Sequence, residues 1–231
     1  KLGIRIIFSE NEKIINSNFK NSKNTLIVFT PAIDKKNKIL NYFKSNNFKI
    51  VKRADLLADI VNSSFCIAIA GTHGKTTTTS ILSHILYNSE LKFTSFIGGV
   101  LNKYESNIMI RGSEIFIVEA DEYDKTFLKM KPNIASILNV DGDHYDIYDD
   151  IDDINNSFKK FANSLKKNGI LFHNSTLNFN GIRFGEDSFA DAKIINKKNY
   201  NDRLIFDIQY QNNIYKNIVL NMLGDHNAFN A

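Results

Sequence analysis

The chain has 231 residues, 43% hydrophobic and 23% charged, which suits a globular protein with one large core or two smaller ones. Its net charge of +4 comes from lysines scattered among asparagines, without the clustered basic face that would indicate a nucleic-acid partner. No run approaches the roughly 20 apolar residues that span a bilayer, and the first residues lack a signal-peptide layout, so we expect no membrane insertion. The single cysteine, Cys66, lies in an apolar run and favours a reducing, cytoplasmic setting.

The first 62 residues have the pattern of part of an α/β domain. β-branched and aromatic runs predict strands at 3–9, 25–30 and 48–52, with a helix between the last two. A short helix over 53–62 then leads into the next strand. We place a domain boundary near Asn62, which gives one domain over 1–62 and a second over 63–231.

The second domain begins with strands that alternate with helices. Strands are expected at 65–70, 115–119, 134–140 and 170–173, and helices at 75–87 and 151–167. This order predicts an α/β fold with a mostly parallel sheet that is covered on both faces. Short alternating runs at 181–185, 192–198, 203–211 and 214–221 then predict an antiparallel meander.

The segment AIAGTHGKTTTT at 68–79 joins a predicted strand to a predicted helix through a glycine-containing turn. The glycines allow backbone N–H groups to approach phosphate oxygens, while Lys75 and the helix N-terminus supply positive charge and a threonine hydroxyl can ligate Mg²⁺. Two residues separate the glycines, whereas the general P-loop has four, so the loop alone predicts only a nucleoside triphosphate. The predicted ATP-binding residues here are Gly71, Thr72, His73, Gly74, Lys75, Thr76 and Thr77.

Two further candidates follow predicted strands. Glu119 ends one strand, and His144 follows another, so both are expected at the sheet edge that carries the loop. A carboxylate is a natural Mg²⁺ ligand and an imidazole an unusual one. A solvated acidic turn with a surface histidine is the alternative, but the phosphate loop favours metal ligands at Thr76, Glu119 and His144. Lys75, Glu119 and His144 are the predicted catalytic residues.

Four segments occur in the order and approximate spacing of the Mur ligases: GTHGKTTTT (71–79), EADEYDKTFLKMKP (119–132), DGDHYDIY (141–148) and GDHNAFNA (224–231). The chain resembles this family over essentially its whole length, and most closely its alanine-adding branch. The resemblance implies an ATP- and Mg²⁺-dependent ligase of peptidoglycan synthesis, acting on UDP-N-acetylmuramate and L-alanine through an acyl phosphate. It also implies that residues 1–62 end a Rossmann-like UDP-sugar domain and that 63–231 form most of a P-loop ATP-binding domain.

The resemblance also assigns roles to residues. It implies that Lys75 and Thr76 contact ATP phosphates and Mg²⁺, that Glu119 binds Mg²⁺, and that His144 binds a second Mg²⁺ near the acyl phosphate. It places His226, Asn227 and Asn230 on the nucleotide side, and gives Thr30 a weaker substrate contact. Some sister ligases carry a carbamylated lysine in the region of Lys159 or Lys160; we expect unmodified surface lysines there.

Other functions remain open at this point. A recycling ligase that attaches a tripeptide to UDP-N-acetylmuramate shares the first two segments, but carries a longer insertion after EADEYD than the residues 126–133 found here. The loop sequence GTHGKTT, with His73, matches a folylpolyglutamate synthase less well. A different class of protein, a nucleotide-binding module or an ATPase without ligase chemistry, is a further alternative. The diphosphate loop and amino-acid pocket are expected outside this segment, which should therefore bind ATP poorly and ligate nothing by itself. The sequence gives no oligomeric state.

Overall fold

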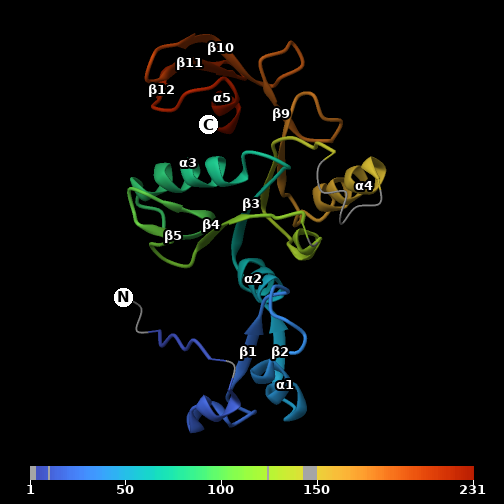
Figure 1. Cartoon of the computed structure of the whole chain (residues 1–231). Coiled ribbons are helices and arrows are strands. Elements are labelled where there is room, and N and C mark those ends of the chain that lie inside the picture. The colour runs from blue at the N-terminus through green and yellow to red at the C-terminus, as the bar shows by residue number, and fades with distance from the viewer. Residues whose placement is uncertain (1–3, 10, 124, 143–149) are drawn as a thin grey trace. The chain divides into compact units, whose positions relative to one another are not determined.

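A computed structural model describes residues 4–9, 11–123, 125–142 and 150–231 (Figure 1). The chain forms two compact units, Lys1–Leu57 and Ala58–Ala231. The division falls inside helix α2 (Arg53–Asn62), before the boundary predicted at Asn62. The assignment of the first unit to a UDP-sugar domain stays a prediction.

The first unit is built on a β-α-β crossover. β1 (Leu26–Phe29) pairs in parallel with β2 (Lys49–Lys52), and α1 (Lys38–Ser45) connects them. Two 3₁₀ turns, η1 (Glu12–Ile14) and η2 (Ser17–Phe19), precede the sheet. The strand predicted at 3–9 is wrong, because residues 4–9 have no regular structure and no described strand pairs with them. An apolar run becomes a strand only where another strand completes its hydrogen bonds.

The second unit is organised around β3 (Phe65–Ala70). This strand pairs in parallel with β6 (Ile115–Glu119) on one side and β7 (Ile134–Ile137) on the other. β4 (Phe93–Leu101) lies beside β6, and β5 (Ser106–Ile110) is the antiparallel edge strand. β7 continues in parallel to β8 (Ile170–Asn174). The apolar run of β3 reflects its central position, with Cys66, Ala68 and Ala70 fully buried.

Two helices cover this sheet on opposite faces. The connection through α3 (Lys75–Tyr87) and the one through α4 (Ile151–Ala162) run in opposite directions across the strand order, and right-handed crossovers then require opposite faces (Figure 1). Phe158 and Phe161 of α4 pack on Phe127 of η3 (Thr126–Lys129). The helix predicted to reach 167 ends at Ala162, because the Ser164 hydroxyl bonds the Met130 and Phe161 carbonyls and residue 166 bonds Pro132.

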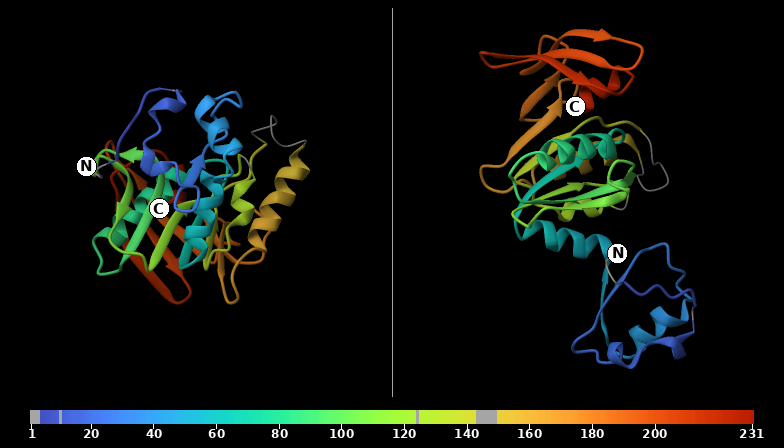
Figure 2. Two further views of the ribbon diagram at one scale, coloured as in Figure 1. Left: turned by 90° about the horizontal axis from the view of Figure 1, so that it is seen from below. Right: turned by 90° about the vertical axis from the view of Figure 1, so that its left-hand side faces the viewer.

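The last strands extend the same sheet. β9 (Ile182–Gly185) pairs in parallel with β8 and with β10 (Ala192–Asn199), so the prediction of an antiparallel meander is wrong for β9. It is correct for β10, β11 (Leu204–Tyr210) and β12 (Asn213–Leu220), which form the orange and red end of the sheet in Figure 2. Across the described residues the sheet has ten strands, in the order β12-β11-β10-β9-β8-β7-β3-β6-β4-β5. The predicted α/β fold class is confirmed.

None of the helices in the described ranges has the length and apolar character needed to cross a membrane. Cys66 is a free, buried thiol, and its burial raises its pKa to about 12, which makes it a poor nucleophile. The cytoplasmic setting stays a prediction.

Candidate nucleotide-binding site

The phosphate loop connects the end of β3 to the first turn of α3. Gly71 and Gly74 have φ of 142° and 83°, in the region that favours glycine. A Cβ on Gly71 would lie 3.1 Å from Leu138 Cβ and 3.2 Å from Asn139 N, and a Cβ on Gly74 would overlap Asn230 Oδ1. Both glycines are therefore required by backbone conformation and by close neighbours.

The Lys75 ammonium group lies against the backbone of this loop. Its Nζ donates to the carbonyl oxygens of Gly71 at 2.6 Å and Thr72 at 3.3 Å. It also donates to both carboxylate oxygens of Glu122, at 3.0 and 2.8 Å. Glu122 is only 2% exposed. The ammonium group is thus fixed at the start of α3, where it can neutralise phosphate charge together with the helix N-terminus.

Two side-chain oxygen groups that could bind a metal meet beside the loop. The Thr76 hydroxyl donates to Glu119 Oε2 at 3.0 Å, and Gly98 N of β4 donates to Glu119 Oε1. A Cβ on Gly98 would lie 2.6 Å from Glu119 Oε2, so the glycine leaves room for the carboxylate. One carboxylate and one hydroxyl fit Mg²⁺, which binds few protein ligands and completes its shell with water and substrate phosphates.

No cluster of three or more His, Cys, Asp and Glu side chains that could hold a metal occurs among the residues that the structure describes. The predicted ligand His144 lies outside those residues, as does Asp143. Its role as a metal ligand stays a prediction.

Residues that follow β7 make hydrogen bonds to the phosphate loop, and their sequence did not indicate this role. Asn139 Oδ1 accepts from His73 N at 2.7 Å, and its Nδ2 donates to His73 O at 3.0 Å. Asn139 O also accepts from Thr72 N at 3.3 Å. The Thr72 hydroxyl accepts from Asp141 N at 2.9 Å, so this side chain supports the loop. The His73 side chain is 63% exposed and lies 3.7 Å from Asp141.

Helix α5 (His226–Asn230) brings one predicted nucleotide residue to the loop. Asn230 is buried against Gly74, and its Nδ2 donates to Asn227 Oδ1 at 3.2 Å. Asn227 is buried too, and its Nδ2 donates to Leu223 O at 2.7 Å. The exposed His226 packs its ring against Gly224. The structure therefore places Asn230 at the loop, with Asn227 as its support.

The β10–β12 strands hold α5 in place, which gives a structural role to a region the sequence left unexplained. Ala228 of α5 is buried with Leu204 and Phe206 of β11. Asp225, at the start of α5, accepts from Asn199 Nδ2 at 2.8 Å and lies 3.2 Å from Lys197 Nζ, both on β10.

The Mur ligase middle domain family matches residues 69–231, which is most of the chain and includes every element of this site. The chain belongs to the Mur ligase family.

Two similar relatives have the same name. The UDP-N-acetylmuramate–L-alanine ligase of Christiangramia forsetii is 41% identical over 95% of this chain and 48% of the relative. The enzyme of the same name from Flavobacterium psychrophilum is 40% identical over 99% of this chain and 51% of the relative. The chain thus spans about half the length of these Mur ligases.

Solved Mur ligases share the fold. The UDP-N-acetylmuramate-alanine ligase of Thermotoga maritima has a TM-score of 0.77 at 22% identity, over 91% of this chain and 51% of that chain. A Neisseria meningitides ligase of UDP-N-acetylmuramate and L-alanyl-γ-D-glutamyl-meso-diaminopimelate has a TM-score of 0.75 at 21% identity, over 89% and 70%. The Thermotoga maritima MurF ligase in complex with ADP has a TM-score of 0.64 at 17% identity, over 91% and 59%.

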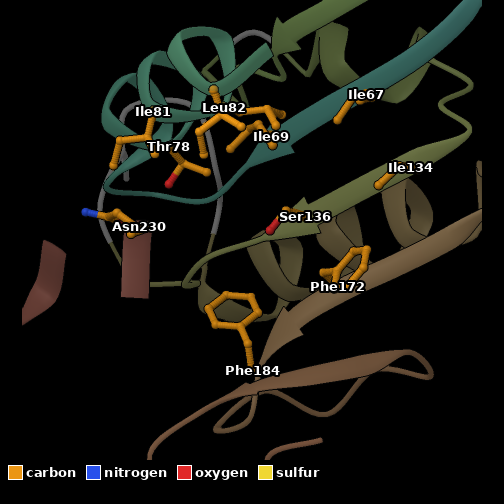
Figure 3. A pocket seen from close by; sticks show the side chains of 12 residues that line it. Ile67, Ile69, Thr78, Ile81, Leu82, Ile134, Ser136, Phe172, Phe184 and Asn230 are labelled. Carbon is orange, nitrogen blue, oxygen red and sulfur yellow. The ribbon is translucent and has the colours of Figure 1, made fainter. Parts of the chain in front are cut away.

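An apolar pocket of about 390 Å³ lies in this Mur ligase chain along the side of α3 (Figure 3). Ile67 and Ile69 of β3, Leu82 of α3 and Phe172 of β8 line it, and Asn230 lies at its side. This lining is unsuited to a charged triphosphate, since it offers few polar partners. The phosphate loop, and not this pocket, is the candidate nucleotide site.

The remaining predicted residues are not among those that make the hydrogen bonds described above at the loop. Thr77 is half-buried in the first turn of α3. Thr30 follows β1 in the first unit and is half-buried, and its backbone carbonyl oxygen accepts from Ile33 N at 3.1 Å in a turn. Lys159 and Lys160 are exposed on α4. The functional roles of these four residues stay predictions.

Proposed function

We propose that the whole protein is an ATP- and Mg²⁺-dependent ligase that joins the carboxylate of UDP-N-acetylmuramate to L-alanine in cytoplasmic peptidoglycan precursor synthesis. The observation that carries this proposal is the 41% identity, over 95% of the chain, to a relative named for that reaction. The geometry at the phosphate loop supports it, because Lys75 is fixed beside the loop, and the Thr76 hydroxyl and the Glu119 carboxylate place oxygen atoms next to it.

The reaction consists of two displacements. A carboxylate oxygen of UDP-N-acetylmuramate attacks the γ-phosphorus of ATP, ADP leaves, and an acyl phosphate forms. The alanine amino group then attacks the acyl carbon, inorganic phosphate leaves, and the amine loses a proton as the amide bond is completed. No hydrolytic water takes part in either displacement.

The chain's own residues act mainly by positioning charge. Lys75 and the backbone N–H groups at the start of α3 stabilise negative charge on the transferring phosphoryl group. The Thr76 hydroxyl and the Glu119 carboxylate would hold Mg²⁺, which when bound neutralises phosphate charge. Asn230 lies against Gly74, where its amide can contact the nucleotide side of the loop.

We also propose that the first unit belongs to the region that binds the sugar nucleotide. Its parallel β1-α1-β2 arrangement supports this proposal, because the carboxyl ends of parallel strands are common ligand sites. Thr30 follows β1 at such an end. A Thr30→Ala variant of the whole protein should raise the KM for UDP-N-acetylmuramate and leave that for ATP unchanged.

The decisive experiment measures phosphate release from ATP and Mg²⁺ by the whole protein with UDP-N-acetylmuramate, adding L-alanine, the tripeptide or neither. We expect release that depends on alanine and is lost in Lys75→Ala. Release with the tripeptide alone would identify a recycling ligase. Release that is indifferent to every acceptor would leave an ATPase.

A further inference from the structure

We propose that Asn139 is a positioning residue that fixes the backbone of the phosphate loop for ATP; this inference rests on the proposed ATP site. Its side-chain amide bonds both backbone polar atoms of His73, accepting from N at 2.7 Å and donating to O at 3.0 Å. One side chain thereby forms hydrogen bonds with both the N–H and the C=O of His73, the residue that precedes Gly74.

The loop needs hydrogen bonds of this kind because it lies beyond the end of the pairing between β3 and β7. Register between β3 and β7 ends at the pair Ala70 and Ile137, and Leu138 N still donates to Ala70 O at 3.0 Å. Beyond this point, Thr72 N bonds Asn139 O at the longer distance of 3.3 Å. Gly71 and Gly74 make the connection conformationally free, so ordering it costs entropy unless other groups restrain it.

The chemistry of the brace requires an amide. An asparagine offers a donor and an acceptor in one plane, which matches one backbone C=O and one N–H. An aspartate at this position would keep the acceptor for His73 N, but would direct a second oxygen at His73 O. An alanine would leave both backbone groups without this partner. Preorganised N–H groups are what phosphate charge requires, so the brace should act on ATP binding.

The chain contains a matched control at the other end of the same strand. Asn133 precedes β7, and its Oδ1 accepts from Cys66 N at 3.0 Å, at the start of β3. The two asparagines therefore flank β7 and make the same kind of bond to the β3 segment. Of these two asparagines, only Asn139 is hydrogen-bonded to the phosphate loop. Asn133→Ala therefore shows how loss of a purely structural asparagine changes KM and hydrogen exchange.

The experiment compares Asn139→Ala, Asn139→Asp and Asn133→Ala in the whole protein. Steady-state rates give KM for ATP and for UDP-N-acetylmuramate, and hydrogen exchange is followed in peptides that cover 71–77. We expect Asn139→Ala to raise the KM for ATP about tenfold, as loss of two hydrogen bonds predicts, with the KM for the sugar nucleotide unchanged. Exchange in the loop should become faster in both Asn139 variants and stay unchanged in Asn133→Ala.

The outcomes separate this inference from the proposed function. If the wild type ligates alanine but Asn139→Ala matches Asn133→Ala in KM and in loop exchange, the inference is overturned and the function stands. If the wild type shows no ATP-dependent turnover, the proposed function fails. If hydrogen exchange in the loop is also equal in all variants, the inference about Asn139 is overturned as well. Should Asn139→Ala misfold, the isosteric Asn139→Asp decides, since an unchanged KM for ATP and unchanged exchange in it would contradict the inference.

Discussion

The phosphate-loop edge of the sheet and the extension formed by β9–β12 (residues 182–220) use similar polar side chains in different ways. At the loop edge the partners are distant in sequence: Lys75 and Glu122 are 47 residues apart, and His73 and Asn139 are 66 apart. In the extension the partners are local, as with Arg183 and Asp191, which are 8 apart.

The local contacts of the extension stabilise its own hairpins. Asp207 of β11 accepts from Asn196 Nδ2 and from Asn217 N, both at 2.8 Å. Asn196 and Asn217 have left-handed φ of 55° and 56°, at the irregular positions of β10 and β12. The distant contacts instead hold a loop and a carboxylate at strand ends. Substitutions at the loop edge should therefore change ATP binding and turnover, whereas substitutions in the extension should change the stability of the fold.

Lys75→Ala should give the largest effect, because it removes the cation that we propose stabilises the transferring phosphoryl group. Loss of one such stabilising group typically lowers kcat by about 10²–10³, and we expect that loss of alanine-dependent phosphate release. The substitution also takes the ammonium partner from the buried Glu122, so the Tm should fall.

A second variant separates these two effects. Adding Glu122→Gln to Lys75→Ala removes the buried charge, and should restore Tm without restoring turnover. Recovery of activity together with stability would show that Lys75 only supports the fold.

Gly98→Ala should alter the Mg²⁺ requirement. Its Cβ would lie 2.6 Å from Glu119 Oε2, and a flexible carboxylate can move away at little cost in stability. Charged contacts of this kind are worth roughly 1.5–3 kcal/mol, so the Mg²⁺ concentration for half-maximal rate should rise about tenfold or more.

The neighbouring Gly99→Ala is the matched control, because among the residues that the structure describes its Cβ would meet only Thr76 Cγ2, at an ordinary 3.4 Å. The measurement is the initial rate against Mg²⁺ at saturating ATP. An equal shift in both variants would mean that the position of Glu119 does not decide metal binding.

The sequence predicts what is local and misses what depends on distant partners. The β3, loop and α3 unit was predictable because an apolar strand, two glycines and a lysine follow one another within a few residues. Strands β4 and β5 were not proposed; β4 contains Gly98 and Gly99, which lower strand propensity, although Gly98 makes room for Glu119.

The brace at Asn139 was missed for a related reason. The sequence places Asn139 in the strand predicted over 134–140, whereas β7 ends at Ile137. The local sequence does not show that its side chain reaches His73, because this contact depends on the pairing of β7 with β3. The parallel pairing of β9 was missed as well, because short alternating runs do not reveal strand direction.

Asp207→Asn tests the extension. One of its two accepted hydrogen bonds must be lost, and we expect the Tm to fall by about 2–4 °C. The KM for ATP should stay within about twofold of the wild type, because surface and scaffold substitutions away from a site rarely act further. Asp202→Asn, at an exposed ion pair with the adjacent Arg203, serves as the control and should leave Tm unchanged. A rise in the KM for ATP in Asp207→Asn alone would show that the extension acts on the loop.

Asp191 should give the smallest effect on Tm, and this effect should disappear at acid pH. The hydrogen bonds from the Arg183 guanidinium, together with the Arg183 backbone N–H, lower the pKa of this carboxyl to about 2. A carboxyl with a depressed folded pKa stabilises the protein above its unfolded value of about 3.9 and loses that contribution as pH falls through about 2.

The Tm difference between wild type and Asp191→Asn should therefore be constant from neutral pH to about 5 and shrink towards pH 2. Thermal unfolding at several pH values measures it, and a difference that does not depend on pH would contradict the assigned ion pair. Turnover at neutral pH should not change in this variant. If the KM for ATP rose there, the contrast between the two regions would fail, because α5 would be transmitting strain from the extension to Gly74.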